Sequence, residues 1–300
     1  LLRRLLKFKS VKIMNTNKPP ISFEFFPPKT DLGKEKLLVT HRDLSDYQPE
    51  FFSVTYGAGG STQERTINMV LELNQRGIST APHISCIGAT EEKIKELLDH
   101  YLKAGINRLV ALRGDLPSGM GATTGQFSYA SDLVAYIKSH YGDAFHIEVA
   151  AYPEMHPQAP DFVADLRHFV NKANAGADSA ITQYFFNPDS YFYFVDEIRK
   201  LGCDIDVVPG IMPITNYSNL VRFSDGCGAD IPRWIRKKLE SFHDDKAGIV
   251  EFGTEVVSKL CERLIQEGVP ALHFYSMNQT QASSSILANL GYETKQPVRA

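Results

Sequence analysis

The chain has 300 residues, of which 43% are hydrophobic, and its 32 basic and 35 acidic residues give a formal net charge of −3. This length and apolar content can bury a large core, and they suit one α/β barrel as well as two ordinary domains. The near balance of charge gives no reason to expect nucleic acid as a partner. No apolar run approaches the roughly 20 residues that a membrane span needs, so we expect a cytoplasmic protein that binds small molecules.

The N-terminal segment, residues 1–18, is basic and begins LLRRLLKFKS. It could form a short amphipathic helix at a membrane surface, but it lacks the uninterrupted apolar stretch and the small-residue cleavage site of a signal peptide. We expect a disordered tail here, a catalytic domain over residues 19–293, and a short C-terminal tail over 294–300.

Short β-branched or aromatic runs alternate with longer amphipathic stretches along the rest of the chain. This alternation is typical of repeated βα units around a parallel sheet. The predicted strands cover residues 21–26, 51–56, 79–86, 108–114, 146–152, 179–186, 206–212 and 271–277.

The stretches between these strands have the spacing of helices. Apolar residues recur every three or four positions over 94–102, and the pattern stops at Gly105; similar patterns stop at Gly176 and Gly202. Eight strand–helix pairs predict a single-domain (β/α)8 barrel, typically about 250 residues long, and no GxGxxG follows the first strand to favour a doubly wound sheet. The sequence DIPRWIRKKLESF predicts an extra helix inserted before the last strand.

The C-terminal ends of barrel strands are the usual place for an active site, which directs attention to Glu24 in the first strand. Glu24 stands among three phenylalanines in SFEFFPP, and alternation along a strand points it into the barrel mouth. Desolvation there would raise the pKa of the carboxyl group toward neutrality, as a general acid requires. The alternative is a strand glutamate paired with a buried lysine or arginine.

Other strand ends carry weaker signals. The glycines of TYGAGGST could bring backbone N–H groups close to a phosphate, or could serve the turn alone. His83 and His156 show no HxH or HExxH spacing, and the four cysteines form no CxxC pair, so we expect no metal site.

Charged residues also follow the fourth strand and line one predicted helix. Arg113, Gly114 and Asp115 come directly after an apolar run, with no turn spacer between. Asp165, His168 and Lys172 recur at spacings of three and four, which sets them along one helical face. Such a row is either a solvated surface or, extended from His156, a place where a lysine meets a phosphate.

Taken together, these stretches resemble the methylenetetrahydrofolate reductases, in particular the short bacterial type that consists of the catalytic barrel alone. The resemblance runs from Ile21 to Gly291. It rests on an ordered set of motifs, FEFFPPK, SVTYGAGG, PHISC, LRGDLP, YASDLV, AAYPEMHP, ITQYFF, PGIMPI and HFYSMN.

The resemblance implies a (β/α)8 flavoprotein. In this family FAD carries a hydride from NADH or NADPH to 5,10-methylenetetrahydrofolate and gives 5-methyltetrahydrofolate. Glu24 would be the general acid that helps open the five-membered ring of the folate. Asp115, near the flavin and the pterin, would make the reduced flavin a better hydride donor, and Arg113 with Gly114 would lie against the FAD.

The same resemblance implies further contacts. Thr55 is similar to a residue that contacts the nicotinamide, Gln183 to one that contacts nicotinamide and pterin, and Phe223 to a ring that stacks on either substrate. One pocket for both substrates implies a ping-pong cycle. The remaining residues that would line the FAD are Tyr56, Ala58, His83, Tyr129, Ala130, Tyr152, His156, Asp165, His168 and Lys172.

Two positions depart from the bacterial pattern, in which we expect glutamine and arginine where this chain has Asn219 and Gln279. We assign both positions to substrate binding and expect the folate tail to be held differently. Competing interpretations are a flavin barrel of the proline dehydrogenase kind, a metal-dependent barrel hydrolase or aldolase that uses His83, His156 and Asp115, and a catalytically silent binding protein. The resemblance also favours a homo-oligomer.

Overall fold

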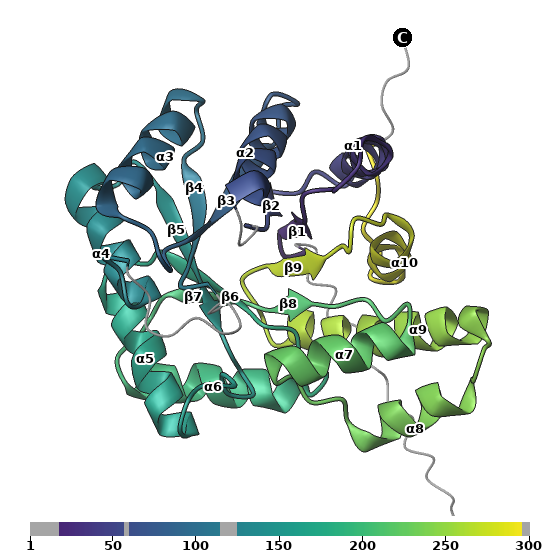
Figure 1. Ribbon diagram of the computed structural model, residues 1–300. Helices are drawn as coiled ribbons and strands as arrows, with labels where there is room; N and C mark the ends of the chain where they lie inside the picture. Colours follow the sequence, from purple (N-terminus) through teal and green to yellow (C-terminus); the bar gives the residue numbers. More distant parts are fainter. Residues whose placement is uncertain (1–17, 57–59, 115–124, 296–300) are drawn as a thin grey trace, which may run out of the picture.

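A computed structural model describes residues 18–56, 60–114 and 125–295, with strands and helices in alternation (Figure 1). All strand pairs in this part of the chain are parallel. The strands are β1 (Ile21–Phe25), β2 (Phe51–Val54), β3 (Ser79–Ser85), β4 (Arg108–Leu112), β5 (His146–Ala151), β6 (Ser179–Thr182), β7 (Asp206–Val208), β8 (Gly210–Ile211) and β9 (Leu272–Tyr275).

The helices lie outside the ring of strands (Figure 1). They are α1 (Asp31–Ser45), α2 (Gly60–Asn74), α3 (Glu91–Lys103), α4 (Ala130–Tyr141), α5 (Phe162–Asn174), α6 (Pro188–Lys200), α7 (Tyr217–Cys227), α8 (Arg233–Ser241), α9 (Lys246–Gln266) and α10 (Gln281–Asn289). The predicted (β/α)8 architecture is therefore confirmed.

The seventh predicted strand, residues 206–212, is divided into β7 and β8 at Pro209. β7 pairs with β6 and β8 pairs with β9, so the sheet order runs β7-β6-β5-β4-β3-β2-β1-β9-β8. Proline has no N–H to donate, and its carbonyl accepts from the backbone of His273 at 3.0 Å while the Gly210 N–H donates to the Thr182 hydroxyl at 2.8 Å. The two halves of one broken strand thus close the barrel.

Three of the predicted helix ends follow the expected rule. α3, α5 and α6 stop one or two residues before Gly105, Gly176 and Gly202, which have φ angles of 76°, 115° and 78°. Glycine tolerates this left-handed region, which lets the chain leave each helix and turn toward the next strand. The predicted extra helix is α8, which lies between α7 and α9 ahead of β9.

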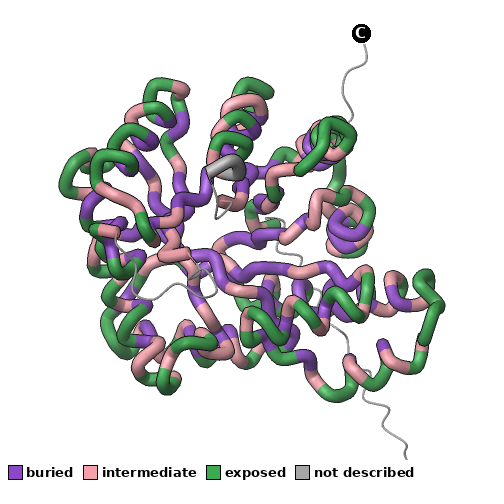
Figure 2. Tube along the Cα trace, in the orientation of Figure 1, coloured by how far each residue is buried: buried purple, intermediate pink, exposed green. Residues whose placement is uncertain are grey.

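Two apolar clusters hold the barrel together. Buried residues lie mainly along the strands, and the outer sides of the helices are exposed (Figure 2). The larger one lies between the strands and the helices and contains Phe23, Phe25 and Phe52, each with no exposed surface. The smaller one fills part of the barrel interior and consists of Phe51, Ala81, Val110 and Ile181. The remaining interior positions are largely polar, and these positions form the candidate site.

No helix in the described ranges is long and apolar enough to cross a membrane. The two ends of the described barrel meet, because the Tyr292 hydroxyl donates to the Pro19 carbonyl at 2.7 Å. The expected N-terminal tail falls almost wholly outside the described residues, so its disorder stays a prediction, as do the domain limits.

Candidate active site

Glu24 lies inside the barrel because β1 alternates. Phe23 and Phe25 belong to the outer core, so the residue between them faces the opposite side of the sheet. In register, Glu24 stands opposite Ser53 of β2 and Tyr275 of β9, and its side chain is 20% exposed. The carboxylate is therefore sheltered but reachable from solvent, and it faces the barrel interior as strand alternation predicted.

The basic groups beside Glu24 are two histidines. Its Oε2 lies 3.4 Å from Nε2 of His83 and 4.0 Å from Nε2 of His273. Burial lowers the pKa of His83; the charge of Glu24 raises it and that of His273 lowers it, so the net direction is down and a neutral ring is favoured. Among the described residues the His83 Nε2 atom has no hydrogen-bond partner. In the part of the chain that the structure describes, no lysine or arginine forms an ion pair with Glu24, in contrast to the alternative interpretation.

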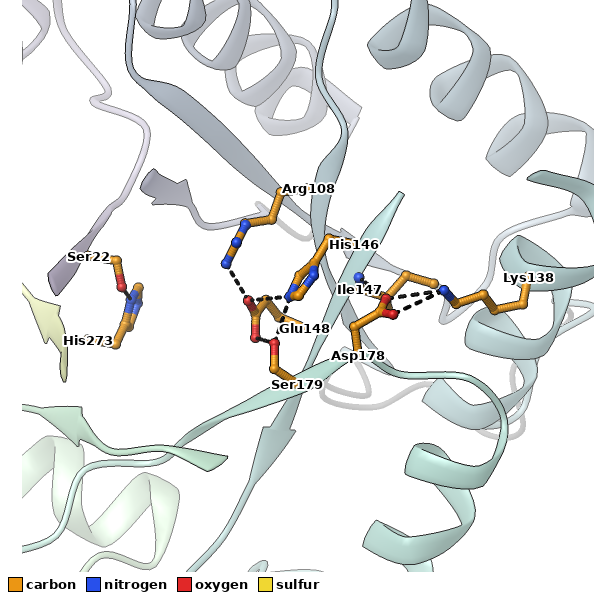
Figure 3. Close-up of polar contacts among 9 residues, drawn as sticks. All are labelled: Ser22, Arg108, Lys138, His146, Ile147, Glu148, Asp178, Ser179 and His273. Carbon is orange, nitrogen blue, oxygen red and sulfur yellow. Dashed lines mark hydrogen bonds and ion pairs between the residues drawn. The ribbon is translucent and has the colours of Figure 1, made fainter. Parts of the chain in front are cut away.

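His273 is fixed in the barrel interior by two serines. Its Nδ1 lies 2.7 Å from the Ser22 hydroxyl (Figure 3). Its Nε2 lies 3.4 Å from the Ser53 hydroxyl. Tyr275 closes the same side, where its hydroxyl donates to the Thr182 carbonyl at 2.6 Å. Burial raises the pKa of the Tyr275 hydroxyl well above the ordinary value of a tyrosine, and the nearby charge of Glu24 adds to this effect. The phenol therefore stays neutral.

Sequence reasoning missed His273 and Tyr275. The signal was available, because Leu272 and Phe274 are buried core residues and the residues that alternate with them, His273 and Tyr275, must face the barrel interior. The same alternation that located Glu24 applies to the last strand.

The turn after β4 depends on glycine. Gly114 has a φ of 88°, and a Cβ on it would lie 1.9 Å from the Ser85 hydroxyl oxygen. That hydroxyl donates to the Arg113 carbonyl at 2.9 Å, which holds the turn against β3. The charged turn predicted after the fourth strand is thus built from a close approach that only glycine allows. Asp115 lies outside the described residues.

The loop after β5 gathers several of the predicted residues. The His156 N–H donates to Asp165 Oδ2 at 2.8 Å, and the Tyr152 and His156 rings meet edge to face at 4.5 Å. The Gln158 N–H donates to His156 Nδ1 at 3.0 Å, and its side-chain oxygen accepts from the Arg113 guanidinium. Gln158, which the sequence did not single out, therefore joins the β4 turn to the β5 loop.

The predicted helical row is α5, and its members divide between interior and surface. The Lys172 ammonium donates to the Ala150 carbonyl of β5, under the site. Burial lowers the pKa of Lys172 to about 8; Arg113 lowers it further and Asp165 opposes the shift. His168 is exposed, and its ring stacks near that of Tyr129 at 6.3 Å. Asp165 and Lys172 therefore contact the β5 loop and strand β5, and His168 lies on the surface.

The other predicted residues are placed less closely together. Tyr129 is 55% exposed beside the buried Ala130 at the start of α4, and Thr55 and Tyr56 follow β2 half-buried. Gln183 follows β6 and its side-chain oxygen accepts from the Tyr184 N–H at 3.0 Å. Three further predicted residues lie on other parts of the chain than Glu24: Asn219 and Phe223 on α7, and Gln279 after β9. Ala58 lies outside the described residues.

Among the described residues there is no group of three histidine, cysteine or acidic side chains placed to hold a metal ion. The histidines near Glu24 hydrogen-bond to serines or face one carboxylate.

Comparison with known proteins decides the family. The sequence profile described as methylenetetrahydrofolate reductase matches residues 9–291. The chain belongs to this family. Its relatives carry the name 5,10-methylenetetrahydrofolate reductase, so the chain is an enzyme of the oxidoreductase class.

The Escherichia coli (strain K12) 5,10-methylenetetrahydrofolate reductase is 39% identical over 272 residues, which cover 90% of each chain. The Arabidopsis thaliana protein named methylenetetrahydrofolate reductase (NADH) 1 is 36% identical over 298 residues, which cover 95% of this chain and 50% of the plant protein.

Among solved structures, a Clostridium thermocellum protein described as uncharacterized, and as binding two copies of 5-methyl-5,6,7,8-tetrahydrofolic acid, superposes with a TM-score of 0.61. The match covers 93% of this chain and 96% of that one at 17% identity, and it confirms the barrel fold.

Proposed function

We propose that the chain reduces 5,10-methylenetetrahydrofolate to 5-methyltetrahydrofolate with NADH or NADPH, through FAD held at the C-terminal mouth of the barrel. The observation that carries this proposal is the Glu24 carboxylate, sheltered at the mouth between His83 and His273, in a member of this reductase family. Catalytic residues of such barrels usually lie at this end of the strands, and carboxyl groups are among the side chains that serve as general acids.

The residues around the mouth fit FAD. Arg113 and Lys172 are close enough for their charges to interact. Burial lowers the pKa of Lys172 and Arg113 lowers it further, and Asp165 offsets the two only in part, so additional negative charge beside them would be favourable. A diphosphate would supply that charge, with the planar Arg113 guanidinium able to bind it bidentately. The buried His83 Nε2 atom, which forms no hydrogen bond within the described residues, fits a ligand that hydrogen-bonds there.

FAD would accept a hydride from the nicotinamide and deliver it to the folate, in a ping-pong cycle with one pocket for both substrates. The chain itself then has three tasks. Arg113, Lys172 and His168 hold the anionic part of the cofactor. Tyr152, His156 and Asp165 fix the β5 loop that lies against it. Glu24 handles the proton.

Glu24 would deliver a proton to the folate when the five-membered ring opens to the electrophilic iminium. A carboxyl group that is 20% exposed can exchange its proton with solvent between turnovers. The Nε2 atoms of His83 and His273 lie 3.4 and 4.0 Å from Oε2, and we expect these contacts to keep the carboxyl group directed into the mouth.

The substrate contacts follow the family pattern. We assign Thr55 to the nicotinamide, Gln183 to nicotinamide and pterin, Phe223 to stacking on either substrate, and Asp115 to the flavin. Asn219 and Gln279 are both exposed, which suits contact with the solvent-facing tail of the folate. Because neither is charged, we expect a weaker hold on the tail's glutamate than an arginine would give.

Anaerobic stopped-flow spectroscopy of the purified protein tests the proposal. We expect a yellow protein whose flavin absorbance is bleached by NADH or NADPH and restored by 5,10-methylenetetrahydrofolate, with 5-methyltetrahydrofolate as the product. Parallel initial-rate lines would support the ping-pong order. A colourless protein, or a reduced flavin that methylenetetrahydrofolate does not reoxidise, would overturn it. A homo-oligomer is expected in the same preparation, and analytical ultracentrifugation measures it.

A further inference from the structure

A second polar cluster lies inside the barrel at the opposite end from Glu24. Arg108, His146 and Ser179 are the first residues of β4, β5 and β6, and all three meet the carboxylate of Glu148 (Figure 3). Arg108 Nη1 lies 2.8 Å from Glu148 Oε1, the Ser179 hydroxyl donates to Oε2 at 2.6 Å, and His146 Nε2 lies 3.2 Å from Oε1. We call these four residues the floor cluster.

The floor cluster keeps Glu148 charged. Burial raises the pKa of this carboxyl, but the bonds from His146 and Ser179 and the charge of Arg108 outweigh it, and the net direction is down. Glu148 is 1% exposed, so water cannot replace Arg108 as the partner of its carboxylate. Arg108 is therefore held firmly in place.

Arg108 connects the floor cluster to the site above it. Its guanidinium carbon lies 4.4 Å from the centre of the Phe51 ring. The Phe51 ring in turn stacks on the His273 ring, with centroids 5.7 Å apart and planes 22° apart. His273 is the ring whose Nε2 lies 4.0 Å from Glu24.

We propose that Arg108, anchored by Glu148, is a positioning residue that holds Phe51 flat against His273 and so keeps the imidazole directed at Glu24. Ser22 and Ser53 contact the two nitrogen atoms on the edge of the His273 ring, at 2.7 and 3.4 Å, and neither contact packs against a face of the ring. The Phe51 ring stacks on one face and so limits the tilt of the imidazole. The consequence for the reaction rests on the proposed role of Glu24.

Stability alone does not require this arrangement. A buried ion pair is often replaced by apolar residues of similar volume at no cost to stability, so a barrel floor needs no charge. A cation over an aromatic ring has directional preference, which an aliphatic side chain of the same size lacks. The contacts from Arg108 to Phe51, from Phe51 to His273 and from His273 to Glu24 form a connected series. Such directional contacts are what a positioning role needs.

Two variants test the proposal without leaving a lone buried charge. Phe51→Leu removes the ring that transmits the contact and leaves the floor cluster intact. Arg108→Met combined with Glu148→Gln removes both members of the pair. Lys138→Met is the control, because Lys138 forms an ion pair of 3.2 Å with Asp178 outside the barrel interior and does not contact the site (Figure 3).

The first readout is the imidazole 15N NMR spectrum of the purified protein, with the His273 signals assigned from a His273→Asn variant. The second is the pair of half-reactions. We expect both test variants to shift the His273 signals, to slow reoxidation of the flavin by methylenetetrahydrofolate roughly tenfold, and to leave flavin reduction by nicotinamide within about twofold. KM for the folate should change by less than about twofold, and Lys138→Met should match wild type.

Unchanged His273 signals in either test variant, or an equal loss in the two half-reactions, would overturn the proposal. Shifted signals with an unchanged folate half-reaction would also overturn it, because the ring would have moved without consequence. If the wild-type protein does not reduce methylenetetrahydrofolate, the proposed function fails instead, and the NMR spectra still decide whether Arg108 and Phe51 position His273.

Discussion

The barrel interior holds two glutamates in opposite surroundings. Glu148, at the amino-terminal ends of the strands, is 1% exposed and has three close partners at 2.6–3.2 Å. Glu24, at the carboxyl-terminal ends, is 20% exposed, and its neighbouring histidine nitrogens lie at 3.4 and 4.0 Å. The Glu148 carboxylate has short contacts to all three of its partners, whereas the histidine nitrogens near Glu24 lie too far away for good hydrogen bonds.

The difference separates structure from chemistry. A buried charge is tolerated when its hydrogen-bonding capacity is filled, and such a carboxylate can neither bind a ligand nor take up a proton easily. A sheltered carboxylate with long contacts and solvent access can do both. The predictions below are ways to break or sharpen this contrast.

Glu24→Gln should have the largest effect. The amide keeps the size of the side chain and cannot donate an acidic proton, so the folate half-reaction should fall by about 10²–10⁴-fold. The nicotinamide half-reaction should stay within about twofold, as stopped-flow absorbance of the flavin will show. Unfolding free energy should change by less than about 1 kcal/mol, since no short bond is lost. Equal losses in both half-reactions would mean that Glu24 serves the flavin and not the folate.

Arg108→Met should be the strongest test of the other glutamate. Leaving Glu148 buried without its cation should lower the free energy of unfolding by about 3–5 kcal/mol, measured by chemical denaturation. Adding Glu148→Gln should recover most of that loss, because the uncompensated charge is gone. A single variant as stable as wild type would show that Glu148 is not held by this pair.

Gly114→Ala tests the turn that carries Arg113 to the mouth. With a φ of 88° and a Cβ that would meet the Ser85 oxygen at 1.9 Å, the substitution should cost about 1–3 kcal/mol and loosen FAD. Thermal unfolding and the flavin content after dialysis measure the two effects. Gly202→Ala is the matched control, with a similar φ of 78° and no atom within 4 Å of the added Cβ. It should show the backbone strain without loss of flavin.

Lys172 predicts a smaller, pH-dependent effect. Its pKa of about 8 lies below the ordinary 10.5, so the unfolded chain binds more protons between these values. The stability of the flavin-free protein should therefore rise with pH from about 8 to 10.5. A bound diphosphate would raise the pKa again, so FAD binding near pH 9 should take up as much as about one proton. Calorimetry in buffers of different ionisation enthalpy measures the uptake, and Lys172→Met should abolish it.

Local sequence patterns predicted the eight βα units and the position of Glu24, because strand alternation and helix-ending glycines act over a few residues. The split at Pro209 was not predicted, since it depends on which neighbours the two halves find, β6 on one side and β9 on the other. Alternation along the last strand could have placed His273 in the barrel interior. Its contact with Ser22 could not be predicted, because the two residues are 251 positions apart.

The floor cluster shows the same limit. Arg108 and Glu148 are 40 residues apart on adjacent strands, and only the register of β4 against β5 brings the two side chains together. From the sequence alone, Arg108 and Glu148 are each a single charged residue in an apolar run, and nothing indicates that they form a pair. The mouth was easier to predict because the family motifs mark it.

A crystal structure of the protein with FAD and 5-methyltetrahydrofolate bound tests the central claim most directly. We predict a Glu24 carboxylate oxygen within hydrogen-bond reach of the folate, about 2.6–3.2 Å directly or through one water, with the flavin ring on the opposite side of the pterin. A Glu24 side chain directed away from the flavin and the folate, bonded to the barrel as fully as Glu148 is, would contradict the account.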